Sequence, residues 1–194
     1  MIQKAIIIFL AAVLTNNFVL TYFLGLCPFF GVSEHASSAI GMGFASTFVM
    51  TLTAITAWIM DWLVLRPLHL EFLQTAVFIL VIASLVQFVE MFIKKTSKEL
   101  YKALGIYLPL ITTNCIVFGL AIIGSMKNYN LLENTMLGFG AGVGFTLALV
   151  LMAGIREELE FKNVPEPLKG TGIALIVAGL MALAFMGFSG MVSL

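Results

Sequence analysis

The chain has 194 residues, of which 61% are hydrophobic and only 10% are charged. Soluble domains usually carry about 25% charged residues, so this composition predicts an all-α integral membrane protein surrounded mostly by lipid. Ten basic and ten acidic residues give a net charge of zero. That balance argues against nucleic-acid binding, which requires a basic surface. We expect a single transmembrane domain over residues 1–194 and no separate soluble domain.

Six apolar stretches are long enough to cross a hydrocarbon core of about 30 Å, for which a helix needs roughly 20 residues. In chain order they are Ala5–Leu26, Ser38–Met60, Phe72–Ile93, Leu104–Ser125, Leu131–Ala153 and Thr171–Met191. The first stretch is too long for the apolar region of a secretion signal, and we interpret it as a transmembrane segment. The sequence therefore predicts six transmembrane helices joined by short loops.

Basic residues are divided unevenly between the two sets of loops. The loops after the first, third and fifth segments hold seven of them: Lys94, Lys95, Lys98, Lys102, Arg156, Lys162 and Lys169. The other loops and the termini hold three: Lys4, Arg66 and Lys127. Because positive charge favours the cytoplasmic side of a membrane, both termini are predicted on the outer side.

The two halves of the chain share short matching patterns. Thr15 and Asn17 in the first segment match Thr112 and Asn114 in the fourth at a shift of 97 residues. At a shift of 95, Gly43-Phe44 and Thr51-Leu52 match Gly138-Phe139 and Thr146-Leu147. Three spans per half force the halves into opposite orientations, so we expect two inverted-topology three-helix repeats, about residues 1–95 and 96–194.

Polar residues interrupt the first and fourth segments near their middles. Thr15–Asn17 lies in the first segment, and Pro109 precedes Thr112–Asn114 in the fourth. Asparagine competes for backbone hydrogen bonds, and proline disfavours helical geometry at Leu108. One interpretation is a pair of kinked helices whose polar groups stabilise packing. The paired occurrence favours the other, in which non-helical backbone within Leu108–Asn114 and near Thr15–Asn17 lines a functional site.

The only two cysteines, Cys27 and Cys115, lie in these same two segments. Buried cysteines are often small packing residues, and two thiolates supply half of the four that a [2Fe–2S] cluster requires. Straight helices would place Cys27 near the cytoplasmic surface and Cys115 near mid-bilayer. The two could therefore serve one metal centre only if at least one segment is broken, and the remaining ligands would have to come from another chain.

Three further groups of residues have simpler interpretations. The glycine run Gly138–Gly144 lies inside an apolar span, so it predicts close helix packing and not a phosphate loop. Asp61, Arg66, His69 and Glu71 are interpreted as solvated loop charges. Arg156–Glu160 is interpreted as a cytoplasmic loop and a candidate docking surface.

Several motifs together resemble the RnfA/NqrE family of membrane subunits, over nearly the whole chain. The resemblance rests on Asn16–Leu20, Phe23–Phe29, Gly31–Ser33, Pro109–Cys115, Gly154–Glu158, Val164-Pro165 and Gly179–Phe188. The pairing of Cys27 with Pro28 and the Asn16-Asn17 pair resemble the Rnf branch more than the Nqr branch.

The resemblance implies an electron-transfer subunit that is not an enzyme when isolated. Members of the family have six spans and pair with a homologous, oppositely oriented subunit, RnfE. The two chains hold one [2Fe–2S] cluster between them, and the motif match assigns Cys27 and Cys115 as this chain's iron ligands. The complex also contains RnfB, RnfC, RnfD and RnfG, lies in the cell (inner) membrane, and couples electron transfer between ferredoxin and NAD⁺ to Na⁺ or H⁺ transport. The redox chemistry belongs to the cofactor.

The residues alone leave a second function open. Broken, inverted segments are also typical of small secondary transporters that bind a solute or ion at the midplane of the membrane. Such a transporter would not need Cys27 and Cys115 as thiolates.

Overall fold

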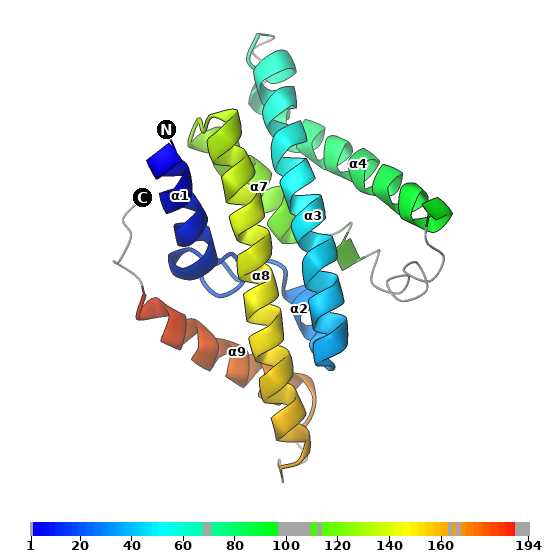
Figure 1. Ribbon diagram of the computed structural model, residues 1–194, viewed down its shortest axis with the longest axis vertical. Coiled ribbons are helices and arrows are strands. Elements are labelled where there is room, and N and C mark those ends of the chain that lie inside the picture. The colour runs from blue at the N-terminus through cyan, green and yellow to red at the C-terminus, as the bar shows by residue number, and fades with distance from the viewer. Residues whose placement is uncertain are drawn as a thin grey trace.

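The computed structural model describes residues 2–67, 71–96, 110–111, 114–162, 165 and 168–188. All regular secondary structure in these ranges is helical (Figure 1). The elements are α1 (Ile2–Leu10), the π-helical turn η1 (Ala11–Thr15), α2 (Leu26–Val32), α3 (Ala36–Met60), the π-helical turn η2 (Asp61–Leu65), the 3₁₀ turn η3 (Glu71–Leu73), α4 (Gln74–Thr96), α7 (Cys115–Met126), α8 (Leu131–Glu160) and α9 (Thr171–Met186).

Three helices in the described part of the chain are long and apolar enough to cross a membrane. They are Ala36–Leu65, Gln74–Met91 and Leu131–Glu160, and three shorter apolar helices cover Gln3–Thr15, Cys115–Met126 and Thr171–Met186. The prediction of an all-helical membrane protein is therefore confirmed. The second, third and fifth predicted segments are continuous helices, whereas parts of the fourth and sixth lie outside the described residues.

Helices α3 and α8 cross at the centre of the fold and run in opposite directions (Figure 1). Their contact is reciprocal, because Gly43 lies against the Thr146 side chain and Gly142 lies against Thr47. Each threonine hydroxyl donates a hydrogen bond to the glycine carbonyl one turn earlier, over 2.7 Å on α3 and 2.8 Å on α8, and the two hydroxyl oxygens are 3.4 Å apart. The packing role predicted for the glycine run is therefore confirmed.

This reciprocal contact relates the two helices by a shift of 99 residues. The sequence identities had paired Gly43 with Gly138 and Thr51 with Thr146 at a shift of 95, which is about one helical turn away. In the structure Gly138 packs instead against Met50 and Ala54. Small residues recur so often in these helices that short identities occur at more than one register, and only the contact distinguishes between them.

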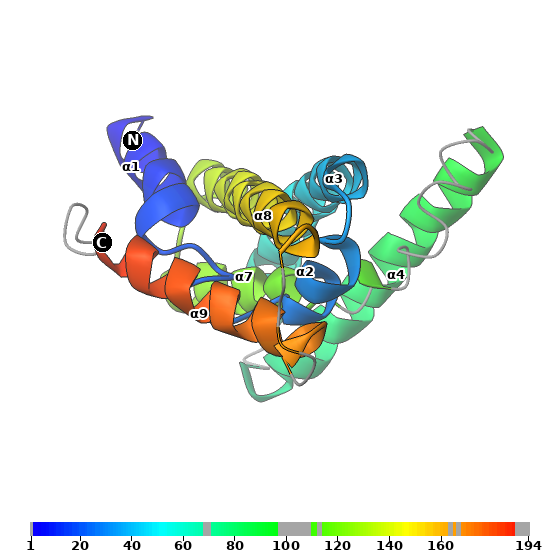
Figure 2. The same cartoon turned by 90° about the horizontal axis from the view of Figure 1, so that it is seen from below.

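The remaining helices surround this central pair unequally. Helices α1 and α7 pack closely on it, whereas α4 and α9 lean away (Figures 1 and 2). Helix α4 buries one narrow face, formed by Phe78, Ile82, Val86 and Val89. Its other faces expose large apolar side chains such as Leu80, Phe88 and Met91. Apolar surface of this extent is suited to lipid or to neighbouring transmembrane helices.

The first predicted segment is broken where the sequence indicated. Its helix ends at Thr15, Asn16 takes a non-helical conformation (φ −114°, ψ 47°), and helical structure resumes only at Leu26. In the fourth segment Leu110 and Ile111 are helical, Asn114 is extended (φ −73°, ψ 115°), and α7 begins at the next residue. The predicted non-helical backbone is thus present near Thr15–Asn17 and at Asn114. The other residues of that prediction, 108, 109, 112 and 113, lie outside the described part.

Candidate functional site

Two buried asparagines hold the backbone at the breaks. The Asn17 Oδ1 atom accepts a hydrogen bond from the backbone N–H of Val19 over 3.0 Å. The Asn114 Oδ1 atom accepts one from the N–H of Ile116 over the same distance, two residues further along the chain in both cases. Both side chains are at least 97% buried. The side chains therefore replace backbone partners that a continuous helix would have supplied.

Asn17 also ties the first break to the second half of the chain. Its Nδ2 atom donates to the carbonyl oxygen of Val13 over 3.2 Å and to that of Gly144 over 2.9 Å. Gly144 lies close to η1, since a Cβ atom there would meet the Ala12 carbonyl oxygen at 2.9 Å. Because an unpaired amide inside a membrane is costly, this contact stabilises α8 against the start of the break.

The other end of the break lies against the start of α7. Gly25 has a φ of +74°, a left-handed conformation that favours glycine. A Cβ atom there would lie 2.8 Å from Ile116 Cγ1 and 3.0 Å from Asn114 Oδ1. The preceding Leu24 lies against Gly119, one turn further into α7. A side chain at position 25 would therefore push the two segments apart.

This contact brings the two cysteine-bearing helix starts together. Cys27 is the second residue of α2, two positions after Gly25, and Cys115 is the first residue of α7, between Asn114 and Ile116. Both cysteines are free and exposed. The break in the first segment therefore places the start of α2 beside the start of α7.

These residues fit half of a four-thiolate iron–sulfur centre. Two exposed thiols on adjacent helix starts can meet ligands supplied from outside the chain, whereas buried packing cysteines could not. Cys115 lies at the amino-terminal end of α7, where the positive end of the helix dipole favours an anionic group. Near it, Asn114 Nδ2 is a buried donor without a hydrogen-bond partner. Within the described ranges, no three histidine, cysteine or acidic side chains come together as a complete metal site.

Arg156 fixes the far end of α2. Its Nη1 atom donates to the Phe30 carbonyl oxygen and to Ser33 Oγ, both over 2.9 Å, and its Nη2 atom pairs with Glu34 at 3.5 Å. The Phe30 carbonyl is among the last of a helix, where no intrahelical donor remains. Arg156 therefore caps the short helix that carries Cys27.

The structure corrects the prediction that Arg156–Glu160 forms a loop. These residues continue α8 to Glu160. Besides the Arg156 contacts with the connection between α2 and α3, Glu157 accepts a hydrogen bond from the N–H of Ala36 over 2.9 Å. These contacts could not be predicted from the sequence, because the partners lie more than 120 residues away.

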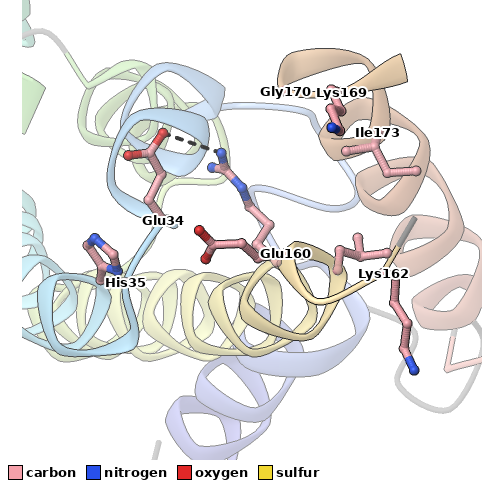
Figure 3. A pocket seen from close by; sticks show the side chains of 9 residues that line it. Glu34, His35, Glu160, Lys162, Lys169, Gly170 and Ile173 are labelled. Carbon is pink, nitrogen blue, oxygen red and sulfur yellow. Dashed lines mark hydrogen bonds and ion pairs between the residues drawn. The ribbon is translucent and has the colours of Figure 1, made fainter. Parts of the chain in front are cut away.

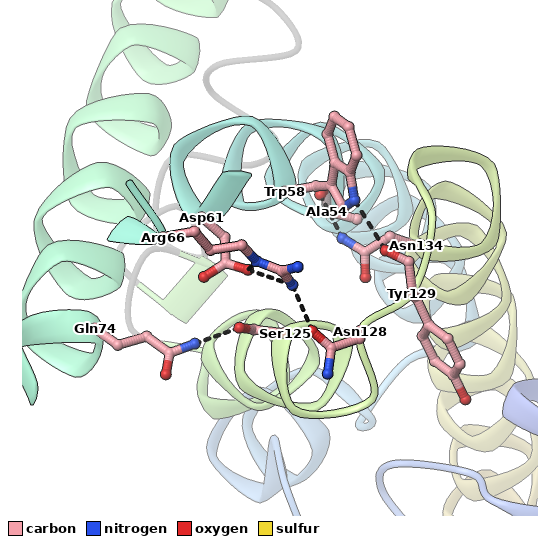
Figure 4. A network of polar contacts seen from close by, with 9 residues as sticks. All are labelled: Ala54, Trp58, Asp61, Arg66, Gln74, Ser125, Asn128, Tyr129 and Asn134. Carbon is pink, nitrogen blue, oxygen red and sulfur yellow. Dashed lines mark hydrogen bonds and ion pairs between the residues drawn. The ribbon is translucent and has the colours of Figure 1, made fainter. Parts of the chain in front are cut away.

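A second polar network closes the opposite end of the bundle (Figure 4). Asp61 and Arg66, predicted as solvated loop charges, form an ion pair of 3.2 Å, and Asp61 is buried at the end of α3. Arg66 also donates to Asn128 Oδ1 over 2.7 Å, and the Trp58 indole donates to the Tyr129 carbonyl over 2.9 Å. These hydrogen bonds connect the end of α3 to the turn between α7 and α8, so the role of the network is structural. His69 lies outside the described residues.

Comparison with known proteins agrees with the motifs. Residues 5–192 match the family described as "Rnf-Nqr subunit, membrane protein". The chain is 57% identical to the A subunit of the ion-translocating oxidoreductase complex of Proteus mirabilis, over 97% of this chain and 98% of that protein. It is 58% identical to the corresponding protein of Cronobacter sakazakii, over 96% and 97%, and 57% identical to that of Escherichia fergusonii, over 97% and 98%. The resemblance inferred from the sequence is confirmed: the chain belongs to the Rnf-Nqr subunit family of membrane proteins.

Proposed function

We propose that this protein is a transmembrane electron-transfer subunit of an Rnf-type, ion-translocating oxidoreductase complex. Cys27 and Cys115 supply two ligands of a [2Fe–2S] cluster, and a homologous subunit, RnfE, supplies the other two. The names of the relatives, which describe them as parts of an ion-translocating oxidoreductase complex, support membership of a multi-subunit assembly. RnfB, RnfC, RnfD and RnfG are the further partners that we expect.

One observation carries this proposal: Gly25 lies directly against Asn114 and Ile116. That contact places two exposed cysteines at neighbouring helix starts although they are far apart in the sequence. A packing role would not require both thiols to be exposed. A shared centre requires exposed thiols, because half of its ligands arrive from another chain.

The cluster supplies one-electron chemistry when it is bound. The chain's own residues hold the thiolates in place. Asn17 and Asn114 fix the broken backbone, Gly25 permits the close approach of the two segments, and Arg156 caps α2 behind Cys27. In this proposal these side chains position the thiolates and take no part in the redox chemistry.

The same proposal includes the inverted repeat and the orientation. The matching hydrogen bonds of Asn17 and Asn114, and the reciprocal contact of antiparallel α3 and α8, support repeats over about residues 1–95 and 96–194. The distribution of basic residues supports both termini on the outer side, and we expect the protein in the inner membrane.

Serine substitution tests the ligand assignment in the purified complex. Serine keeps most of the volume of cysteine but is a poor ligand for iron, so Cys27→Ser and Cys115→Ser should each abolish the electron paramagnetic resonance signal of this cluster. Gly41→Ser is a matched control, because position 41 is exposed with no atom within 4 Å of an added Cβ. It should retain the signal.

Two outcomes would contradict the proposal. Full iron content and electron transfer in either cysteine variant would make that residue a packing residue. Unimpaired ion transport by the chain in vesicles without any partner or cluster would favour a secondary transporter instead.

A further inference from the structure

A second feature, separate from the cysteines, is a pocket of about 550 Å³ between three elements. It lies where the α2–α3 connection, the end of α8 and the start of α9 meet (Figure 3). Its charged lining comprises Glu34, Arg156, Glu160, Lys162 and Lys169, and Leu159 and Ile173 supply apolar wall. We call it the headgroup pocket. A space of this size admits a small polar molecule or the polar end of a larger one.

The charges that line the headgroup pocket are of both signs. The Arg156 side chain is already hydrogen-bonded to Phe30 and Ser33 and paired with Glu34. Among the described residues, Lys162, Lys169 and Glu160 have no ion pair. Figure 3 shows Glu160 and Lys169 on facing sides of the pocket, and Lys162 at its edge with the ammonium group directed outward. Two ammonium groups and one carboxylate are complementary to a ligand that carries both a phosphate and an amine.

An apolar groove of about 480 Å³ adjoins the pocket along α8. It is lined by Val150, Leu151, Gly154, Ile155, Glu158, Leu159 and Lys162, and it shares Leu159 and Lys162 with the headgroup pocket. We call it the acyl groove. At Gly154 an added Cβ would meet no atom within 4 Å, so the absence of a side chain there leaves the groove open. At 1.5 Å per residue, Val150 to Leu159 spans about 14 Å.

The order of residues along α8 gives this composite cavity a direction. Val150 to Ile155 belong to the apolar part of a membrane-spanning helix, and charged residues begin at Arg156. The groove therefore runs from the hydrocarbon region to the membrane surface, where the headgroup pocket begins. A molecule that fills both parts must have an apolar chain and a charged end, which is the form of a membrane phospholipid.

We propose that the headgroup pocket and the acyl groove together bind one zwitterionic phospholipid whose headgroup carries a primary amine. Lys169 holds the phosphate together with Lys162, whose flexible side chain turns inward when the lipid is bound. Glu160 accepts hydrogen bonds from the amine, and one acyl chain lies over Gly154. A purely anionic lipid would leave Glu160 facing negative charge, and a trimethylated amine would offer it no hydrogen bond. The bound lipid would occupy the space between α8 and α9 next to Arg156, the residue that caps α2.

Photo-crosslinking in the assembled complex tests this site. The complex is reconstituted in phosphatidylcholine vesicles containing a minor fraction of phosphatidylethanolamine with a photoactivatable group in its acyl chain. We expect crosslinks within residues 150–159, displaced by unlabelled phosphatidylethanolamine and much less by phosphatidylglycerol or phosphatidylcholine. Gly154→Leu should remove most of the crosslink by filling the groove. Gly41→Leu is the matched control on α3, where an added side chain also meets open space, and it should leave crosslinking unchanged.

Headgroup variants separate the parts of the proposal without filling the groove. Lys162→Gln and Lys169→Gln should each weaken crosslinking about fivefold, the effect expected of one lysine beside an anionic headgroup. Glu160→Gln should allow phosphatidylglycerol to compete as well as phosphatidylethanolamine. Equal competition by both lipids in the unchanged protein would overturn the amine assignment. Crosslinking that survives Gly154→Leu in full, or that occurs in the isolated chain but not in the complex, would overturn the site. The cluster signal should persist in all these variants, so the test is independent of the cysteine assignment.

Discussion

The crossing of α3 and α8 predicts a large effect from adding a single methyl group. In Gly142→Ala the new Cβ would lie 2.5 Å from Thr47 Cα and 2.8 Å from Thr47 Cβ. Favourable carbon–carbon contacts lie at about 3.5–4.0 Å. Relief therefore requires the helices to separate by about 1 Å, because the nearest atom belongs to the backbone and cannot rotate away.

A matched substitution isolates the energy of this clash. Gly41→Ala also replaces a helical glycine, but its Cβ meets no atom within 4 Å. Both variants gain the helix propensity of alanine over glycine, about 1 kcal/mol. That gain cancels in the comparison, and what remains is the cost of overpacking a tight contact, about 1–3 kcal/mol. For a chain of this size the difference corresponds to about 2–12 °C in Tm.

The assay is thermal unfolding of the detergent-solubilised complex, followed as the loss of intact assembly on size-exclusion chromatography after heating. We expect Gly41→Ala to match or exceed the unchanged protein and Gly142→Ala to unfold at lower temperature. If the two variants unfold together, α3 and α8 do not pack through Gly142, and the reciprocal contact on which the repeat proposal rests is wrong.

Two further predictions concern side chains that hold the broken segment. Asn17→Ala removes the partners of the buried Gly144 carbonyl and of the Val19 N–H, so it should destabilise the complex by about 2–4 kcal/mol in the same assay. Asn16→Ala, at a side chain outside these buried hydrogen bonds, should be nearly neutral. Equal effects of the two substitutions would contradict the role given to Asn17. Arg156→Lys keeps the charge but loses the fork that reaches the Phe30 carbonyl. The substitution should broaden or shift the cluster's paramagnetic signal, because α2 moves. An unchanged spectrum and Tm would show that the cap formed by Arg156 does not position Cys27.

The sequence predicted the breaks correctly because their cause is local. Asparagine in the middle of an apolar span has few ways to satisfy its amide, and both Asn17 and Asn114 bond to backbone two residues ahead. The fit of Gly25 against Ile116 could not be predicted in this way. Any glycine permits a positive φ, and only the folded chain shows which segment approaches it.

The charged residues illustrate the same division. Hydropathy located Asp61 and Arg156 correctly at the ends of apolar segments. It could not show that Asp61 is buried beside Arg66, or that Arg156 continues a helix and reaches the α2–α3 connection. Charge at the end of a span is compatible with both solvation and pairing, and the choice depends on donors and acceptors supplied by distant parts of the chain.

The hydrogen bond between Asn17 and Gly144 also constrains the order of events during synthesis. The two residues are separated by 127 positions, so the second, third and fourth predicted spans and part of the fifth follow Asn17 before its acceptor is made. Gly25 is likewise synthesised well before Ile116, the residue against which it packs. The first segment therefore enters the membrane before the partners of its break exist, and it acquires its final shape only when α7 and α8 have joined it. The first segment is thus inserted first but reaches its native contacts late.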